Sequence, residues 1–157
     1  MDIPRRIAAL VGLAAMLACQ GGAPFETIRT GVIIREELVG TFEAISFGST
    51  VDGAATDLLA AGGSLTLELS LSSMVSGRLV APGIGEGGAD LDEDMAGSWT
   101  FDPLTRVVRF TQSAETFVAV ASFVPFRTED FSTILLQADV GAGTPASPAI
   151  EVVLERR

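Results

Sequence analysis

The stretch Ser64–Ser72 reads SLTLELSLS, in which every second side chain is a leucine and every other one is polar or charged. Leu65, Leu67, Leu69 and Leu71 therefore repeat with period two, which places all four on one face of an extended strand. In a helix the same leucines would be spread around the circumference. The stretch predicts a β-strand with an apolar face turned to a core and a polar face turned to water.

Similar strand signals, separated by turn residues, occur along the rest of the chain. The predicted strands are Leu38–Phe47, Ser64–Ser72, Ser76–Ala81, Ala96–Asp102, Thr105–Gln112, Thr116–Val124, Ser132–Val140 and Ile150–Glu155. In the last of them Ile150, Val152 and Leu154 alternate with Glu151 and Glu155, which repeats the pattern of the leucine strand. These segments predict an all-β protein.

The connecting segments carry turn and loop signals. Asp102–Thr105 reads DPLT, and its proline presets the backbone for the second position of a tight turn. Pro82–Glu93 and Gly141–Pro148 are glycine-rich and predict loops. Thr56–Gly63 predicts a single helical turn, with Thr56 as its cap and two glycines at its end.

Eight short strands with mostly short connections predict an antiparallel meander over residues 36–157. Closing that meander into an up-and-down barrel removes its exposed edges, and a two-sheet β-sandwich is the alternative architecture. A barrel of about eight strands has an interior that is either filled by side chains or just able to hold one small ligand.

The amino-terminal residues have the anatomy of an export signal. Arg5 and Arg6 precede an uncharged, mostly apolar run over Ile7–Leu17, which is too short to span a bilayer. Met16-Leu17-Ala18-Cys19 then resembles the lipobox of bacterial lipoprotein signals, and Cys19 is the chain's single cysteine. The resemblance implies a signal peptide over residues 1–18 and acylation of Cys19, including palmitate.

Residues 19–35 are then expected to be a lipidated tether and lead-in, and Phe25–Glu37 reads either as an edge strand or as an ordered lead-in. The expected location is the cell envelope, with the protein held to a membrane by its lipid. Gln20 after the cysteine favours the outer membrane, facing the periplasm or the cell surface, in a host with two membranes.

Composition excludes several classes of function. The net charge of −10 argues against binding to nucleic acid, and the chain contains no histidine, lysine or tyrosine. Without histidine no Ser-His-Asp triad can form, and without lysine no Schiff base. We therefore expect no enzymatic activity and no cofactor. Asp90, Asp92, Glu93 and Asp94 have the spacing of oxygen ligands for Ca²⁺, or form a solvated loop; the sequence leaves that choice open.

Several of these segments together resemble the bacterial lipocalin-like domains. Gly40-Thr41-Phe42 stands where that family's first strand carries a Gly-x-aromatic motif, and the strand reads LVGTFEAISF. GSLTLELSL, SGRLV, LDEDMAGSWTFD and VVRFTQ follow it, so the resemblance spans Glu36–Glu155. It implies a small up-and-down barrel and a pocket for an apolar ligand.

Large apolar side chains on these strands are the candidate ligand contacts: Phe42, Leu67, Leu69, Trp99, Phe101 and Phe110. The same side chains have the bulk that fills the core of a small barrel, and both interpretations stay open. The first hypothesis is a lipid-anchored envelope protein whose lipocalin-like barrel binds a small hydrophobic ligand or lipid. The alternative is a structural or interaction lipoprotein with a solid core, whose rim contacts another envelope protein.

Overall fold

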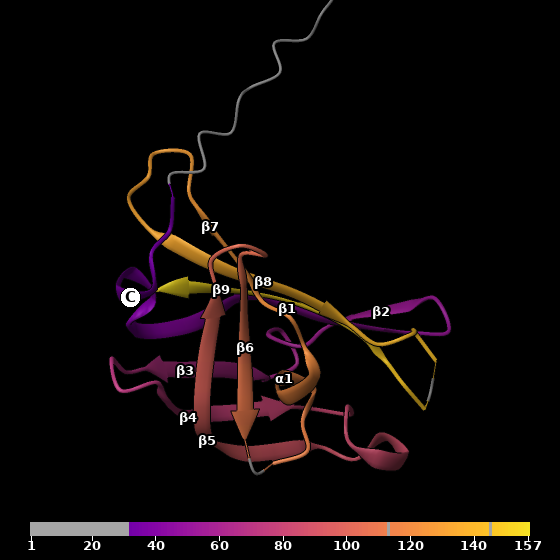
Figure 1. The fold of residues 1–157 in the computed structure, drawn as a ribbon. Coiled ribbons are helices and arrows are strands. Elements are labelled where there is room, and N and C mark those ends of the chain that lie inside the picture. Colours follow the sequence, from indigo (N-terminus) through magenta and orange to yellow (C-terminus); the bar gives the residue numbers. More distant parts are fainter. Residues whose placement is uncertain (1–31, 113, 145) are drawn as a thin grey trace, which may run out of the picture.

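The computed structural model describes residues 32–157 apart from 113 and 145 (Figure 1). In that part of the chain nine strands are accompanied by three short helical turns. In order they are η1 (Arg35–Leu38), β1 (Gly40–Val51), β2 (Ala54–Asp57), β3 (Ser64–Leu69), β4 (Met74–Ala81), η2 (Glu86–Gly88), β5 (Leu91–Asp102), β6 (Val107–Gln112), α1 (Phe117–Val120), β7 (Val124–Arg127), β8 (Ile134–Val140) and β9 (Ala149–Arg156).

The strands of the described residues form one antiparallel sheet in the order β6-β5-β4-β3-β1-β9-β8-β7, with β2 paired to the end of β1. Apart from β2, neighbours in the sheet are consecutive in the chain or are the first and last strands. The sheet nearly closes between β6 and β7, where Val108 and Phe123 exchange backbone hydrogen bonds of 2.8 and 3.0 Å. The predicted eight-stranded up-and-down barrel is confirmed, and the two-sheet alternative is wrong.

Burial follows the alternation of the sequence. Leu65, Leu67 and Leu69 are at most 1% exposed, whereas Glu68 between them is exposed. Leu71 was expected on the same face, but it is 66% exposed, because β3 ends at Leu69 and the chain turns back into β4. The inner face of β3 thus ends at Leu69, where the leucine pattern runs into the turn to β4.

The predicted strand Thr116–Val124 is wrong except at its last two residues, where Phe123 forms a β-bridge and Val124 begins β7. One helical turn, α1, occupies Phe117–Val120, and β7 starts at Val124. Thr116, Val118, Ala121 and Phe123 are the buried positions, so the spacing between them changes from two to three after Val118. Packing of the Phe117 ring against Phe47, with centroids 5.8 Å apart, outweighs the strand preference of the β-branched residues here.

The predicted helical turn at Thr56–Gly63 is also partly wrong. Thr56 lies in β2 opposite Ser49, and the turn begins after Asp57, whose carboxylate accepts a hydrogen bond of 3.1 Å from the Ala60 backbone N–H. Strand β2 exists because β1 is long enough to pair with it beyond β3.

The predicted loop Pro82–Glu93 is too long, because β5 begins at Leu91 and pairs with β4. The tight turn at Asp102–Thr105 is confirmed, with the Asp102 carboxylate accepting a bond of 2.9 Å from the Leu104 N–H. The loop over Gly141–Pro148 is confirmed as well, between β8 and β9.

The described part of Phe25–Glu37 is an ordered lead-in and not an edge strand. Ile33 and Leu38 are buried, and η1 lies at the end of the barrel where β1 starts and β9 ends. The Arg35 guanidinium lies 4.6 Å from the ring centroid of Trp99, a cation–π contact. Figure 1 shows this end, with the C-terminus and the β7–β8 loop, on the left. The lead-in thereby covers one end of the barrel.

If alternation fixes the core, neighbouring substitutions in β3 should differ sharply. We expect Leu67→Ala to lower the free energy of unfolding by about 2–5 kcal/mol, because it leaves a cavity in the core. Glu68→Ala, the matched control on the outer face, should change it by less than about 0.5 kcal/mol. Chemical denaturation followed by circular dichroism measures both. Equal effects of the two substitutions would show that the assigned inner face is wrong.

Candidate functional site

The six predicted ligand contacts come together in the barrel interior. They lie on β1 (Phe42), β3 (Leu67, Leu69), β5 (Trp99, Phe101) and β6 (Phe110). All except the half-buried Phe101 are at most 2% exposed. Side chains that lined a space wide enough for water would show exposed surface toward it, so the interior around these residues is filled. Their role as ligand contacts stays a prediction.

Trp99 shows how tightly this interior is held. Its indole N–H donates a hydrogen bond of 3.0 Å to the backbone oxygen of Ser70, in the turn after β3. Arg35 of η1 contacts its ring and also donates to the Ser73 hydroxyl at 2.5 Å. The one polar atom of the indole therefore has a hydrogen-bond partner without water. The end of the barrel that the lead-in covers, which we call the base, is occupied by protein atoms.

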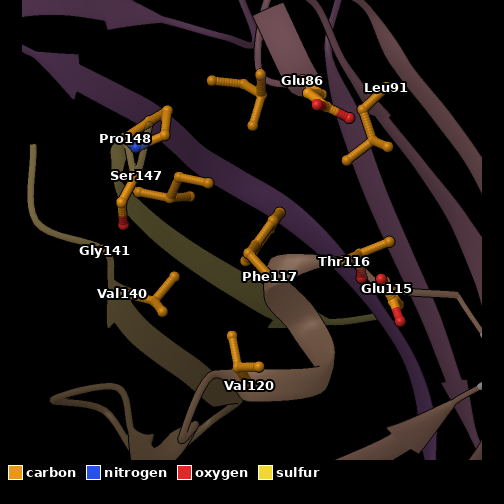
Figure 2. Close-up of a pocket in the computed structure, with 13 residues that line it drawn as sticks. Glu86, Leu91, Glu115, Thr116, Phe117, Val120, Val140, Gly141, Ser147 and Pro148 are labelled. Atoms are coloured by element: carbon orange, nitrogen blue, oxygen red, sulfur yellow. The ribbon is translucent and has the colours of Figure 1, made fainter. Parts of the chain in front are cut away.

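A cleft with a volume of about 280 Å³ lies at the opposite end, and we call it the mouth cleft. It lies between the η2 loop, α1 and the ends of β8 and β9 (Figure 2). Its lining residues are Ile84, Gly85, Glu86, Leu91, Glu115, Thr116, Phe117, Val120, Val140, Gly141, Ser147, Pro148 and Ile150. None of the six predicted contacts is among them.

The short helix α1 shapes the mouth cleft. Figure 2 shows Phe117 rising from α1 into the middle of the cleft, with Leu91 on one side and Pro148 on the other. The Phe47 ring packs against the Phe117 ring, and Val118, on the same helical turn, is fully buried. Val120 is 72% exposed, so the cleft opens to solvent on this side. The helical turn anchors one side chain in the core and presents two to the cleft.

Polar groups in the mouth cleft are few. Thr116 is buried, and its hydroxyl accepts a hydrogen bond of 3.1 Å from the Gln112 side-chain amide. Glu86 and Glu115 are exposed at the rim, and neither carboxylate has a hydrogen bond or ion pair with any residue that the structure describes. The arrangement can bury a small apolar group and offers it few directed hydrogen bonds.

A second cleft, of about 190 Å³, lies at the covered end, and we call it the base cleft. It is lined by Glu37, Arg127, Ser132, Thr133, Ile134, Arg156 and Arg157. The Glu37 carboxylate accepts hydrogen bonds from the Ile34 backbone N–H, at 3.0 Å, and from the Arg127 guanidinium. These two bonds hold the pKa of Glu37 below its ordinary value of 4.5. The base cleft is thus built around an internal ion pair that fastens the lead-in to β7.

Two residues of the acidic run near the η2 loop form ion pairs with an arginine. Asp92 and Asp94 on β5 each lie 2.8 Å from the Arg78 guanidinium on the neighbouring strand β4. Asp90 accepts a hydrogen bond of 3.0 Å from the Gly83 backbone N–H. Within residues 32–157, positions 113 and 145 aside, no group of three acidic, histidine or cysteine side chains is arranged to hold a metal ion. Binding of Ca²⁺ to this run stays an untested hypothesis.

Sequence reasoning missed most of the mouth cleft, because its residues come from loops and from α1. The sequence offered a weak signal at α1, because Phe117–Ala121 is a continuous apolar run without the alternation seen in β3. Such a short run does not by itself distinguish a helical turn from a buried strand. Nothing in the sequence indicated that Pro148 and Ile84 line a common cleft. They belong to two glycine-rich loops that are distant in the chain, and no local sequence pattern predicts that these loops meet.

No family model, curated protein or solved structure matches this chain. The resemblance to lipocalin-like domains therefore stays a prediction from the motifs around Gly40 and Trp99. Cys19 and the predicted signal peptide lie outside the described residues. Across the part of the chain that is described, no helix has the length and apolar character needed to cross a membrane.

The lowered pKa of Glu37 predicts a pH-dependent contribution to stability. The ionised carboxylate is the form that its partners stabilise, so the contribution is present above pH 4.5 and is lost as pH falls through the lower folded-state pKa. Glu37→Gln should therefore lower the free energy of unfolding by about 1 kcal/mol at pH 7, and the difference should shrink below the ordinary pKa of the carboxyl.

Thermal or denaturant unfolding of wild type and variant across this pH range measures the difference. Glu36→Gln is the matched control, because Glu36 is exposed and its side chain has no hydrogen bond or ion pair among the described residues. A difference between wild type and Glu37→Gln that stays constant down to acid pH would contradict the proposed role of the charge.

Proposed function

We propose that this protein is a cell-envelope protein anchored to a membrane through lipid on Cys19, and that its barrel binds a small apolar ligand in the mouth cleft. The observation that carries the proposal is the cleft itself, a hollow of about 280 Å³ with a mainly apolar lining at the end of the barrel opposite η1. Concave, largely apolar sites with a few polar groups are where small ligands usually bind.

The filled interior favours the mouth over the barrel axis as the binding place. Phe42, Leu67 and Trp99 are each at most 1% exposed, so a ligand could enter between them only by displacing core side chains. Displacing them would cost several kcal/mol in lost packing. The mouth cleft needs no such displacement, because Val120 and Leu91 already face its open space.

Binding in this cleft would be passive. A ligand that buries about 200 Å² of apolar surface gains about 5 kcal/mol at about 25 cal/mol per Å². Ordering of the ligand offsets part of that gain, so we expect dissociation constants of about a millimolar or weaker. Phe117 supplies the largest contact surface, since it lies in the middle of the cleft.

The relation between the two ends supports anchoring through the lead-in. Val32, the first described residue, belongs to the segment that covers the base of the barrel, and the mouth cleft lies at the other end. A tether attached at the base would leave the mouth free to exchange ligand. The positive residues and the single cysteine near the start of the sequence are the further support.

The ligand proposal predicts a localised effect of charge in the cleft. Val120→Glu should weaken binding of the uncharged dye Nile red about tenfold, because it places a carboxylate against the apolar lining. Val120 is exposed, so the fold should be unaffected. Leu104→Glu, at a 92% exposed position in the turn after β5, is the control and should bind as wild type does.

Dye fluorescence titration gives the affinities, and native mass spectrometry of protein purified without denaturation would reveal any co-purified lipid or small molecule. Equal weakening by both variants, or undetectable binding by wild type, would argue against a ligand site in the mouth cleft.

The anchoring proposal predicts that Cys19→Ser moves the protein from the membrane fraction to the soluble fraction of the envelope, because the acylated sulfur is lost. Gly21→Ser, two residues away, should leave the protein in the membrane fraction. Mass spectrometry of the wild-type amino terminus should find acyl chains on Cys19. A mature protein with Cys19 unmodified or removed would contradict the proposal.

The second candidate function is a structural or interaction module, which the filled core favours. Twenty-four buried apolar residues of the described chain form one core cluster, whose largest fully buried side chains are Trp99, three phenylalanines and eight leucines. Such a core stabilises a rigid surface whether or not a ligand binds. Failure of both Nile red and native lipid to bind the intact protein would favour this candidate over the first.

A further inference from the structure

We infer that the ligand of the mouth cleft is a cationic amphiphile, an apolar chain or ring bearing a positively charged amine, and not a fatty acid. The inference rests on the proposed function and adds the chemical class of the ligand. It follows from which charges surround the cleft and from how they are placed relative to its apolar part.

The only charged side chains in the lining of the mouth cleft, as far as the chain is described, are Glu86 and Glu115. Each is exposed, and neither has a hydrogen bond or ion pair with a described residue. Some acidic side chains have arginine partners, as Asp92 and Asp94 do in Arg78 and Glu37 does in Arg127, but the two rim glutamates are among those that have none in the described chain. The two rim carboxylates are therefore free to meet the charge of a ligand.

The position of these two carboxylates would set the orientation of a ligand in the mouth cleft. Figure 2 shows Glu86 and Glu115 on the same side of the cleft as Leu91, with Ser147 and Pro148 across from them. Phe117 lies between the two sides. An apolar chain over Phe117 would bring an amine at its end toward this side of the cleft, where it could donate a hydrogen bond to one of the two carboxylates.

The same charges would oppose an anionic ligand. A carboxylate or phosphate head in this cleft would face two glutamates with no arginine in the lining, in a chain whose net charge is −10. The two glutamates would repel a negatively charged head group, and the negative field of the whole chain would add to that repulsion. Three arginines, Arg127, Arg156 and Arg157, line the base cleft at the other end of the barrel, and none lines the mouth cleft.

The test compares three ligands with the same apolar part: decylamine, decanol and decanoate, each below its micelle concentration, by displacement of Nile red at pH 7 and low salt. We expect decylamine to bind about tenfold more tightly than decanoate, with decanol between them, since exposed ion pairs each change affinity by a factor of a few. Added salt should reduce the difference, because it screens exposed charges.

The double variant Glu86→Gln, Glu115→Gln removes both rim charges and should remove most of the preference for decylamine over decanoate. The matched control is Glu68→Gln, Glu151→Gln, which changes the net charge equally at exposed positions on β3 and β9. This control should keep the preference. Circular dichroism of all proteins verifies that the folds are the same.

The outcomes separate the two proposals. Decanol binding without a preference for decylamine over decanoate would overturn the inference and leave the apolar site standing. An equally large preference in wild type and in the Glu86→Gln, Glu115→Gln protein would overturn it as well. Absence of binding by all three ligands would overturn the proposed function and the inference together.

Discussion

Closure of one sheet on itself is the constraint on which the rest of the structure depends. β6 and the segment before β7 are joined by the two backbone hydrogen bonds between Val108 and Phe123. The Phe110 and Phe123 rings meet edge to face beside that junction, with centroids 5.1 Å apart. This short seam takes the place of a full strand pairing, because α1 occupies residues that would otherwise extend β7. The side-chain contact at the seam supplies stability that a longer ladder of hydrogen bonds would have given.

The two ends of the barrel differ in what lies over them. At the base, η1 brings Leu38 into the core, Arg35 onto Trp99 and Glu37 into its ion pair with Arg127. At the mouth, the chain leaves β6, forms α1 and returns, so that Phe117 enters the cleft while Val118 stays in the core. One end is therefore covered by an ordered segment, and the other carries a hollow whose lining comes from loops.

The charges of the chain are divided in the same way. Arginines are placed on the barrel wall and at the base, where Arg78, Arg127 and Arg157 each pair with acidic side chains. The rim of the mouth has glutamates without arginine in the lining of its cleft. Exposed ion pairs of this kind add little to stability one by one, so their main consequence is the sign of the local potential. The proposals for ligand and ligand class both draw on that difference between the ends.

The sequence by itself determined the all-β class and most of the inner face of the sheet, because period-two alternation in stretches such as Leu65–Leu69 and Ile150–Leu154 is a local property of an extended chain. The sequence predicted a barrel with a two-sheet sandwich as the alternative, and only the contact between Val108 and Phe123 decided that one sheet closes on itself. Only the tertiary structure decided that Phe117–Val120 is helical, that Leu71 is exposed and that Phe42 and Trp99 lie in a filled core. Those outcomes depend on contacts between residues far apart in the chain, such as Phe47 with Phe117, which no local pattern encodes. The mouth cleft had the same origin, since two loops and α1 meet there only once the barrel has closed.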